Sequence, residues 1–373
     1  MKTPLKLLLF GLAGGSALCA ADSVLSFGGR LPLSASVAGA LRYHDNIFLT
    51  SNKEGDALVS VTPEIRYVQE GAQVRIHASA AEQFLRYASN SSLNRNLPDL
   101  AGDVNYEGGR AQLGFTASFA ERDQSSTAVR SFDQALRQTE TAASVTGDWS
   151  ATAKTRLSLG SSFNRTNYSD ATTIDQDSWT VPLNGYYELT SKVDLSVGYQ
   201  YRRTRQALAR SNSSDHFLNV GASGDFTAKL KGDVRVGMTR RRLDDRGSEE
   251  DLGLGASLSY AYSEKTTVNL NLSRDFRTSA FGESQRVSSV QVNSQFLISE
   301  VWQANLGFSW ERTNGVQNAD RNDTFTTLET GVTYVVSRTI SASFAYYFKN
   351  SSSRVDFYDF NSNIFSVSGM IRF

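Results

Sequence analysis

A strict alternation of apolar and polar residues through long segments constrains this chain more than any other feature. Residues 192–202, KVDLSVGYQYR, place five apolar or aromatic side chains on one face and polar residues or glycine on the other, and residues 110–119 and 339–348 repeat the pattern. A side-chain period of two is that of a β-strand. These segments run for about ten residues, against about 5–6 in an ordinary strand. That length matches the roughly 9–11 residues that a tilted strand needs to cross a bilayer.

Short and long connections alternate between these segments. Tight connections such as VQEGAQ and YEGGRA recur at intervals of about 40 residues, with two strands in each interval. Longer polar connections, such as LTSNKEGD and LDDRGSEED, lie between them. The pattern predicts a closed antiparallel transmembrane β-barrel of about 18 strands, with 16 as the alternative. Such barrels have short periplasmic turns and longer extracellular loops.

Two soluble all-β folds also have to be considered. A propeller blade repeats at a similar interval, but it needs four strands where this chain has two, and its GH and WD signatures are missing from the sequence. A sandwich is built from shorter strands around one internal core, which does not suit nine long hairpins that each carry one apolar face. The alternation therefore favours the barrel.

The first residues have the pattern of a secretory signal peptide. Lys2 and Lys6 precede an apolar run that ends near Leu18, and small residues follow. We predict a signal peptide over residues 1–21 and a single outer-membrane barrel domain over residues 22–373. The run is shorter than the roughly 20 residues of a membrane anchor, and Leu18 fits a lipoprotein site at Cys19 poorly. We therefore expect export to the outer membrane of a Gram-negative bacterium.

In a membrane barrel the apolar face meets lipid and the polar face lines the lumen. We expect the arginines on the polar face of the strands to set charge selectivity and the amides on that face to contact sugars. These predicted pore-lining residues are Arg66, Arg75, Arg156, Arg202, Arg235, Arg241, Asn269, Asn271, Gln291 and Asn293. We expect an aromatic girdle of Trp149, Trp179, Trp302 and Trp310, because these tryptophans lie toward strand ends on the apolar face. The longest loop, Asp123–Gln138, is either a constriction folded inward or a solvated extracellular loop.

No pattern in the sequence indicates catalysis, so we expect a protein that is not an enzyme. The chain has three histidines, His44, His77 and His216, and none lies in a nucleophile motif or a zinc motif. His44 and His77 lie on strands that could be neighbours. We expect lumen side chains rather than a dyad, and we expect neither a cofactor nor a metal. The net charge of zero gives no electrostatic case for nucleic acid as a partner.

The first hairpin resembles the opening of the putative β-barrel porin 2 family. The matching residues are Tyr43 and the run Asp45–Phe48, followed by Asp56 and Pro63 in the return strand. The resemblance implies an outer-membrane barrel that moves polysaccharide or other hydrophilic solutes, often beside exopolysaccharide export machinery. From the residues themselves, we expect Asp45 and Asn46 to cap the outer loop and Ile47 and Phe48 to pack onto the rim.

Together these features predict an outer-membrane channel, and most specifically a conduit for the export of secreted polysaccharide. The alternatives are a general diffusion porin and a structural or adhesive barrel that acts through its outer loops. The expected partners are outer-membrane lipid, lipopolysaccharide, periplasmic polysaccharide-export proteins and the barrel-assembly machinery. The last strand ends in an apolar and aromatic pattern, with Ile371 and Phe373 in the places of a C-terminal assembly signal.

Overall fold

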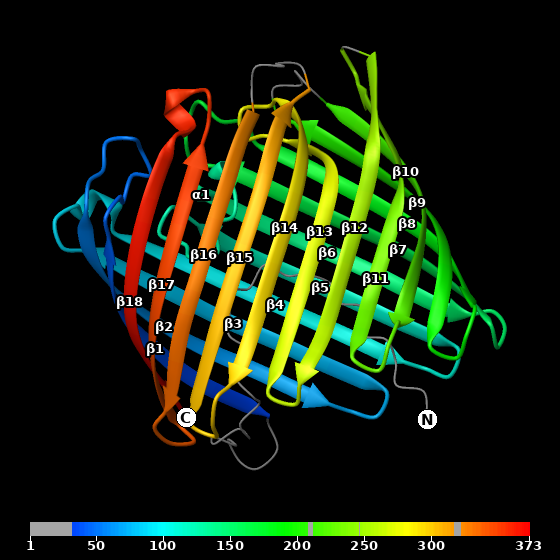
Figure 1. Cartoon of the computed structure of the whole chain (residues 1–373), viewed down its shortest axis with the longest axis horizontal. Helices are drawn as coiled ribbons and strands as arrows, with labels where there is room; N and C mark the ends of the chain where they lie inside the picture. The colour runs from blue at the N-terminus through cyan, green and yellow to red at the C-terminus, as the bar shows by residue number, and fades with distance from the viewer. Residues whose placement is uncertain (1–31, 208–211, 246, 317–321) are drawn as a thin grey trace.

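A computed structural model describes residues 32–207, 212–245, 247–316 and 322–373, and the predicted signal peptide lies outside them. The described residues form one sheet of 18 strands (Figure 1). In chain order the strands are β1 (Leu33–His44), β2 (Asp56–Glu70), β3 (Val74–Tyr87), β4 (Arg95–Glu107), β5 (Ala111–Arg122), β6 (Gln138–Ser150), β7 (Thr155–Tyr168), β8 (Gln176–Glu188), β9 (Val193–Gln206), β10 (Ser213–Asp225), β11 (Leu230–Leu243), β12 (Gly247–Ser263), β13 (Thr266–Thr278), β14 (Ser284–Leu297), β15 (Trp302–Gly315), β16 (Asn322–Val335), β17 (Ile340–Ser352) and β18 (Phe360–Arg372).

The sheet closes on itself. Each strand pairs antiparallel with its neighbours in sequence, and β1 also pairs with β18, with Val37 opposite Ile371 and Tyr43 opposite Phe365. Closure leaves no open sheet edge in hydrocarbon, where unpaired backbone groups would cost several kcal/mol each. The prediction of a closed antiparallel barrel is confirmed, with 18 strands rather than 16. Within the described ranges, no helix is long and apolar enough to cross a bilayer.

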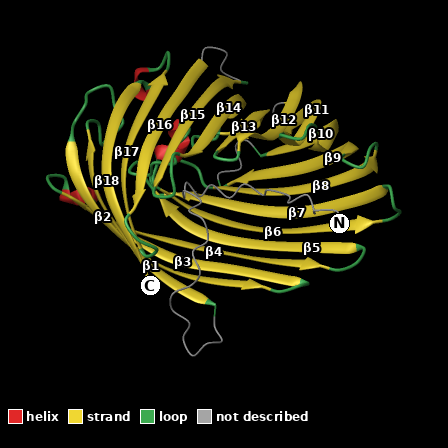
Figure 2. Cartoon of the chain, turned by 60° about the horizontal axis from the view of Figure 1, so that its bottom comes forward, coloured by secondary structure: helices red, strands yellow, loops and turns green. Residues whose placement is uncertain are grey.

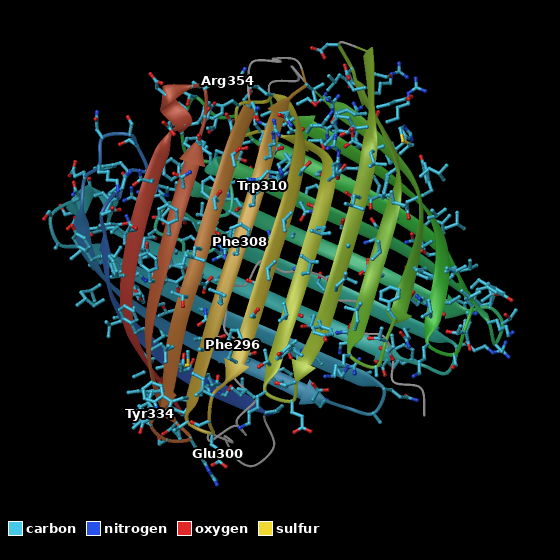
Figure 3. All side chains as sticks on the ribbon, in the orientation of Figure 1. Phe296, Glu300, Phe308, Trp310, Tyr334 and Arg354 are labelled. Carbon is cyan, nitrogen blue, oxygen red and sulfur yellow. The ribbon has the colours of Figure 1, made fainter. Side chains whose placement is uncertain are left out.

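The outer surface is the apolar face predicted from the alternation. Large apolar side chains of every second residue are exposed, among them Val197, Leu218 and Val367. Trp149 and Trp302 lie beside short turns, whereas Trp179 and Trp310 lie nearer the long loops. Figure 3 shows Phe308 and Trp310 above Tyr334 on neighbouring strands of this surface. The placement agrees with the predicted aromatic girdle, whose contact with a membrane interface stays a prediction.

The last strand has the orientation expected from its sequence. Phe365, Val367, Ile371 and Phe373 are exposed on the outer surface, and the Phe373 backbone N–H donates to the carbonyl oxygen of Ala35 at 2.8 Å. The final residue is thus tied to the first strand. Recognition of Ile371 and Phe373 by the assembly machinery stays a prediction.

The short motif after β1 fastens the closing seam at the long-loop end. Asp45 accepts hydrogen bonds from the backbone N–H of Asn363 at 2.6 Å and from its side chain at 2.7 Å, and Lys53 donates to Asp45 at 2.7 Å. The Asn46 amide donates to the carbonyl oxygens of Thr50 and Asn361. Ile47 is 1% exposed, but Phe48 remains exposed. Asn46 therefore caps the outer loop through Thr50, whereas Asp45 caps no backbone group of the described loop residues and bonds to Asn363 of β18 and the Lys53 side chain. Packing onto the rim holds for Ile47 alone.

The seam makes stability depend on pH through Asp45. Burial alone would raise the pKa of Asp45, but the hydrogen bonds from Asn363 and Lys53 outweigh it and hold the pKa below its ordinary value. A carboxyl group with a lowered folded-state pKa stabilises the fold above the unfolded pKa, about 3.9, and the contribution disappears as the pH falls through the folded pKa.

We therefore expect Asp45→Ala to lower the free energy of unfolding at pH 7 by about 1–2 kcal/mol, because several hydrogen bonds to the carboxylate are lost. At pH 3 the difference between the variant and the parent protein should shrink. Urea unfolding in lipid vesicles at the two pH values measures both. A difference of equal size at pH 7 and pH 3 would contradict this role for Asp45.

The histidines are separated by the fold. β2 lies between β1, which carries His44, and β3, which carries His77, so the expectation that their strands could be neighbours was wrong. His44 is buried near the long-loop end, whereas His77 lies toward the short-turn end and contacts Glu70 and Asp103. His216 shares the outer face with Leu218. The three side chains therefore do not form one site.

Candidate channel constriction

The loop between β5 and β6 enters the barrel. Its residues, Asp123–Arg137, are called the constriction loop below, and they include the single turn α1 (Phe132–Ala135). Figure 2 shows this turn inside the ring of strands. Val129 and Ala135 are buried in a cluster with Leu49, Phe325 and Phe360, which come from the first long loop, β16 and β18. Apolar side chains of the loop thus pack on the opposite wall. The loop folds inward, which is one of the two alternatives that the sequence left open.

Polar contacts hold the constriction loop to the same wall. The Lys349 ammonium donates to the carbonyl oxygen of Ser126 at 2.7 Å, and Arg130 pairs with Glu329 at 3.4 Å. Phe132 makes an edge-to-face contact with Tyr358, with 4.8 Å between ring centroids. Asp123 is 2% exposed, and its burial raises its pKa, while burial lowers the pKa of Arg130. The loop is therefore packed into the lumen on both its polar and its apolar side.

A second element enters the lumen from another side. The connection between β13 and β14, residues 279–283, bends inward, and Ser279 and Ala280 are fully buried. The Ala280 carbonyl oxygen accepts from the backbone N–H of Ile174 at 2.8 Å, and its N–H donates to Asp133 at 3.3 Å. This tip thus joins the loop after β7 to the constriction loop. Residues 279–283 carry no sequence signal of this inward bend, because so short a segment cannot be distinguished from an ordinary tight connection.

The inward bend opens the ladder between β12 and β13 at the long-loop end. Pairing of these strands ends at Leu254 and Arg274, although β12 continues to Gly247 and β13 to Thr278. An ion pair between Arg274 and Asp251, at 2.9 Å, spans the gap. Phe276 is 2% exposed there, and the guanidinium of Arg286 lies 5.9 Å from its ring centroid. Side chains thus replace the missing backbone hydrogen bonds.

Below the tip lies a buried network of arginines and carboxylates. Arg241, 1% exposed, donates to both carboxylate oxygens of Asp215 at 2.7 and 2.8 Å. Arg202 donates to Asp215 at 2.8 Å and to Asp275 at 2.7 Å. Arg277 pairs with Glu311 at 2.9 Å. Each of these arginines is neutralised by a carboxylate from another strand, so the network ties β9, β10, β11, β13 and β15 together across the lumen.

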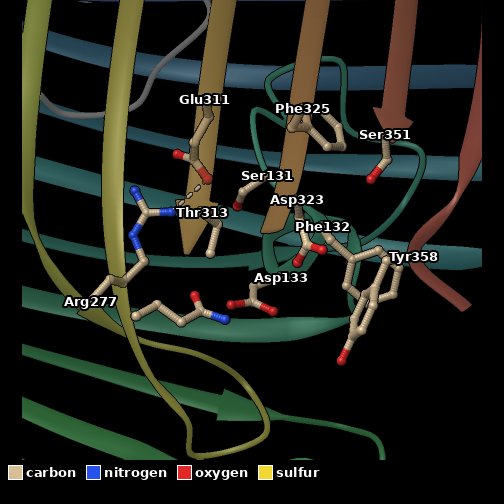
Figure 4. A pocket seen from close by; sticks show the side chains of 11 residues that line it. Ser131, Phe132, Asp133, Arg277, Glu311, Thr313, Asp323, Phe325, Ser351 and Tyr358 are labelled. Carbon is tan, nitrogen blue, oxygen red and sulfur yellow. Dashed lines mark hydrogen bonds and ion pairs between the residues drawn. The ribbon is translucent and has the colours of Figure 1, made fainter. Parts of the chain in front are cut away.

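The two inserted elements divide the outer half of the lumen unequally. On the side of β13–β17 the packing leaves a space of about 20 Å³, between Phe132, Tyr358 and the Arg277–Glu311 pair (Figure 4). That is room for about one water molecule. On the side of β6–β9 there is a cavity of about 280 Å³. Its lining consists mainly of amides, hydroxyls and the three neutralised arginines: Ser131, Asp133, Gln134, Gln138, Glu140, Thr166, Tyr168, Gln176, Ser178, Arg202, Thr204, Arg241, Phe276, Arg277 and Thr278.

All ten predicted pore-lining residues lie on strands, on the face opposite the exposed apolar side chains, but the fold does not gather them in one place. Arg202 and Arg241 line the cavity. The other four arginines each pair with a nearby carboxylate: Arg66 with Glu64, Arg75 with Glu107, Arg156 with Asp148 and Arg235 with Asp233. The amides form two cross-strand pairs, Asn269 with Asn293 and Asn271 with Gln291. Their contact with a solute stays a prediction.

One part of the inner face is apolar, against the expectation of a polar wall. Leu58, Leu85, Tyr87 and Leu97 project inward from β2, β3 and β4, and Ile47 covers them. In the sequence, Leu58 and Leu85 each adjoin another apolar residue and so interrupt the alternation. That interruption was the available signal, and it marks where the first long loop packs back into the barrel.

Comparison with known proteins identifies the family. A family model described as "Putative beta-barrel porin 2" matches residues 29–373. No curated protein matches the chain. Among solved structures, OccK2 (OpdF) from Pseudomonas aeruginosa, in complex with glucuronate, has 13% identity and a TM-score of 0.49, with 91% of this chain and 98% of that chain covered.

Two further structures from the same organism are similar at this level. The outer membrane protein opdK has 11% identity and a TM-score of 0.48, with 91% and 99% of the two chains covered. The siderophore receptor PirA has 10% identity and a TM-score of 0.46, with 91% and 80% covered. The family match extends over nearly the whole chain and includes the motif that fastens the barrel seam. The protein is therefore a porin-like outer-membrane barrel that belongs to the putative β-barrel porin 2 family.

Proposed function

We propose that the protein is an outer-membrane channel for carbohydrate, with the 280 Å³ cavity beside the constriction loop as its selective point. The observation that supports this is the chemistry of the cavity lining. Gln134, Gln138 and Gln176 line the cavity with amides that each make a hydrogen bond within the protein and have further donor and acceptor capacity. Hydroxyls come from Thr166, Thr204 and Ser178. Sugar hydroxyl groups need donors and acceptors of this kind. The volume lies near the lower end of ligand pockets, about 300–1,000 Å³.

The charges of the cavity favour a neutral solute. Its three arginines donate to Asp215, Asp275 and Glu311, so carboxylates of the barrel wall neutralise their positive charges. Glu140 accepts from Gln138 at 2.7 Å and adds a carboxylate to the lining. An anionic solute would compete with these carboxylates for the guanidinium groups. A neutral saccharide meets no such competition.

Export of secreted polysaccharide is the more specific form of this proposal. It is supported by the hydrogen-bonding lumen and by the family resemblance of the first hairpin. A polymer that threads the barrel has to pass the constriction loop one sugar unit at a time or displace the loop. Diffusion of small hydrophilic solutes is the second candidate, and the small volume of the cavity beside the loop favours it.

The experiment uses the purified full-length protein in planar bilayers. We expect ion conductance that neutral oligosaccharides interrupt, and we expect Gln134→Ala with Gln176→Ala to shorten the interruptions about tenfold, because two hydrogen bonds to sugar are lost. Gln295→Ala is the matched control, since Gln295 points inward on β14 near the short turns but does not line the cavity. The control should behave like the parent protein.

Two outcomes would overturn the proposal: a folded protein that does not conduct, or interruptions that the cavity variant leaves unchanged. Removal of the gene separates the two candidates. Loss of surface polysaccharide with normal uptake of small solutes supports export, and the reverse supports a diffusion porin.

A further inference from the structure

The outer face of β9–β11 changes from apolar to cationic along the strands. Near mid-strand the pairing places Val220 between Val197 and Val236. In the next row of outward-facing residues toward the long loops, Leu218 lies between Tyr199 and Met238. These side chains are largely exposed. They have the character of a surface in contact with lipid tails.

The two following rows, toward the long loops, are cationic. His216 lies between Tyr201 and Arg240, and Ser214 lies between Arg203 and Arg242. The tyrosine hydroxyl of Tyr199 lies 2.7 Å from His216 Nδ1, and the ring centroids of Tyr201 and His216 are 5.3 Å apart. His216 and Arg240 thus share a row with Tyr201 and lie one row beyond Tyr199, and Arg203 and Arg242 lie in the next row toward the long loops. We call Arg203, Ser214, His216, Arg240 and Arg242 the basic patch.

The alternation predicts apolar residues at these outward positions, so the charges need an explanation. Carboxylates offset them only in part: Asp244 pairs with Arg203 at 2.5 Å, and Glu250 lies 3.8 Å from Arg240. The side chains of Arg240 and Glu250 are 62% and 61% exposed, and exposed pairs of this kind contribute little to stability. The patch is therefore not accounted for by its internal ion pairs.

We propose that the basic patch binds the phosphate groups of lipopolysaccharide. The patch lies at the long-loop end, which faces the cell exterior in barrels of this class, so the phosphates that it meets belong to the outer leaflet. Tyrosines mark the level of the membrane interface. Arg240 lies in the row of Tyr201, and Arg203 and Arg242 lie one row farther toward the long loops, at the height of headgroups. Arginine forms paired, charge-assisted hydrogen bonds with phosphate, and Arg240 and Arg242 are exposed, whereas Ser214 between Arg203 and Arg242 is buried.

The test measures thermal unfolding of the purified full-length protein in detergent with added lipid. Lipopolysaccharide should raise the melting temperature, and its dephosphorylated form should do so much less. In Arg240→Gln with Arg242→Gln the lipopolysaccharide concentration needed for half of the shift should rise about tenfold, because charge-assisted hydrogen bonds to phosphate are lost. Arg86→Gln with Arg312→Gln removes the same charge from outward positions on β3 and β15 and should leave the response unchanged.

Both double variants should unfold at similar temperatures without lipid, which separates binding from folding. Equal responses of the two variants to lipopolysaccharide would overturn the proposal. So would a shift of the same size with phosphatidylglycerol or with inorganic phosphate alone, because the site would then not recognise the phosphorylated glycolipid. This test is independent of conductance, so it can fail while the channel proposal stands.

Discussion

Replacing residues 125–136 with a short linker is expected to raise single-channel conductance about threefold or more. The linker would have about four glycine and serine residues, a usual hairpin length. Conductance should rise because a barrel of roughly 18 strands has a water-filled lumen when no loop occupies it. A space of about 20 Å³ lies on one side of the constriction loop and a cavity of about 280 Å³ on the other. Removal of the loop joins these spaces into one passage. Planar-bilayer recordings of the full-length variant measure the effect, and interruptions by small saccharides should disappear.

The removal also uncovers Leu49, Phe325 and Phe360, so folding has to be verified by heat-dependent mobility on a gel. Insertion of the same linker at Ala72, in an exposed short turn outside the lumen, is the matched control and should not change conductance. An unchanged conductance in a correctly folded loop variant would show that the constriction lies elsewhere in the barrel.

Asp215→Asn is expected to lower the free energy of unfolding by about 3–5 kcal/mol, because removing one partner of a buried ion pair leaves an uncompensated charge. Arg241 would lose the carboxylate that accepts from its Nε and one of its terminal nitrogens, while Arg202 would keep Asp275. Urea unfolding in lipid vesicles, followed by tryptophan fluorescence, measures the difference. The effect is large because Asp215 and Arg241 are almost fully buried.

Asp233→Asn on the neighbouring strand is the matched control. Asp233 also points inward and pairs with an arginine, Arg235, at 3.4 Å, but both side chains are about two-fifths exposed. Solvated pairs contribute between zero and about 1 kcal/mol. If the two substitutions destabilise the protein equally, burial of the Arg202–Asp215–Arg241 network does not contribute to stability as described.

The wall of the barrel could be predicted from the sequence because it follows from local rules. The period of two decides which side chains face lipid, as Leu195 and Val197 show, and strand length and turn spacing decide the number of hairpins. The same parity placed Arg202 and Arg241 on the inner face. The alternation could not predict that Arg202 and Arg241 share Asp215, because that contact joins three strands through side chains of different lengths.

What fills the lumen was decided by tertiary structure alone. The sequence of the constriction loop suits solvent as well as a barrel interior, and it folds inward because Val129 and Ala135 find Leu49, Phe325 and Phe360 on the far wall. Ala280 and Asp133, far apart in sequence, are joined by a hydrogen bond at 3.3 Å. The side-chain alternation of a strand determines which of its faces meets lipid, whereas the position of a loop depends on contacts with residues elsewhere in the chain. The sequence by itself therefore determined the barrel and its two faces, and only the closed ring of strands determined the constriction and the cavity beside it.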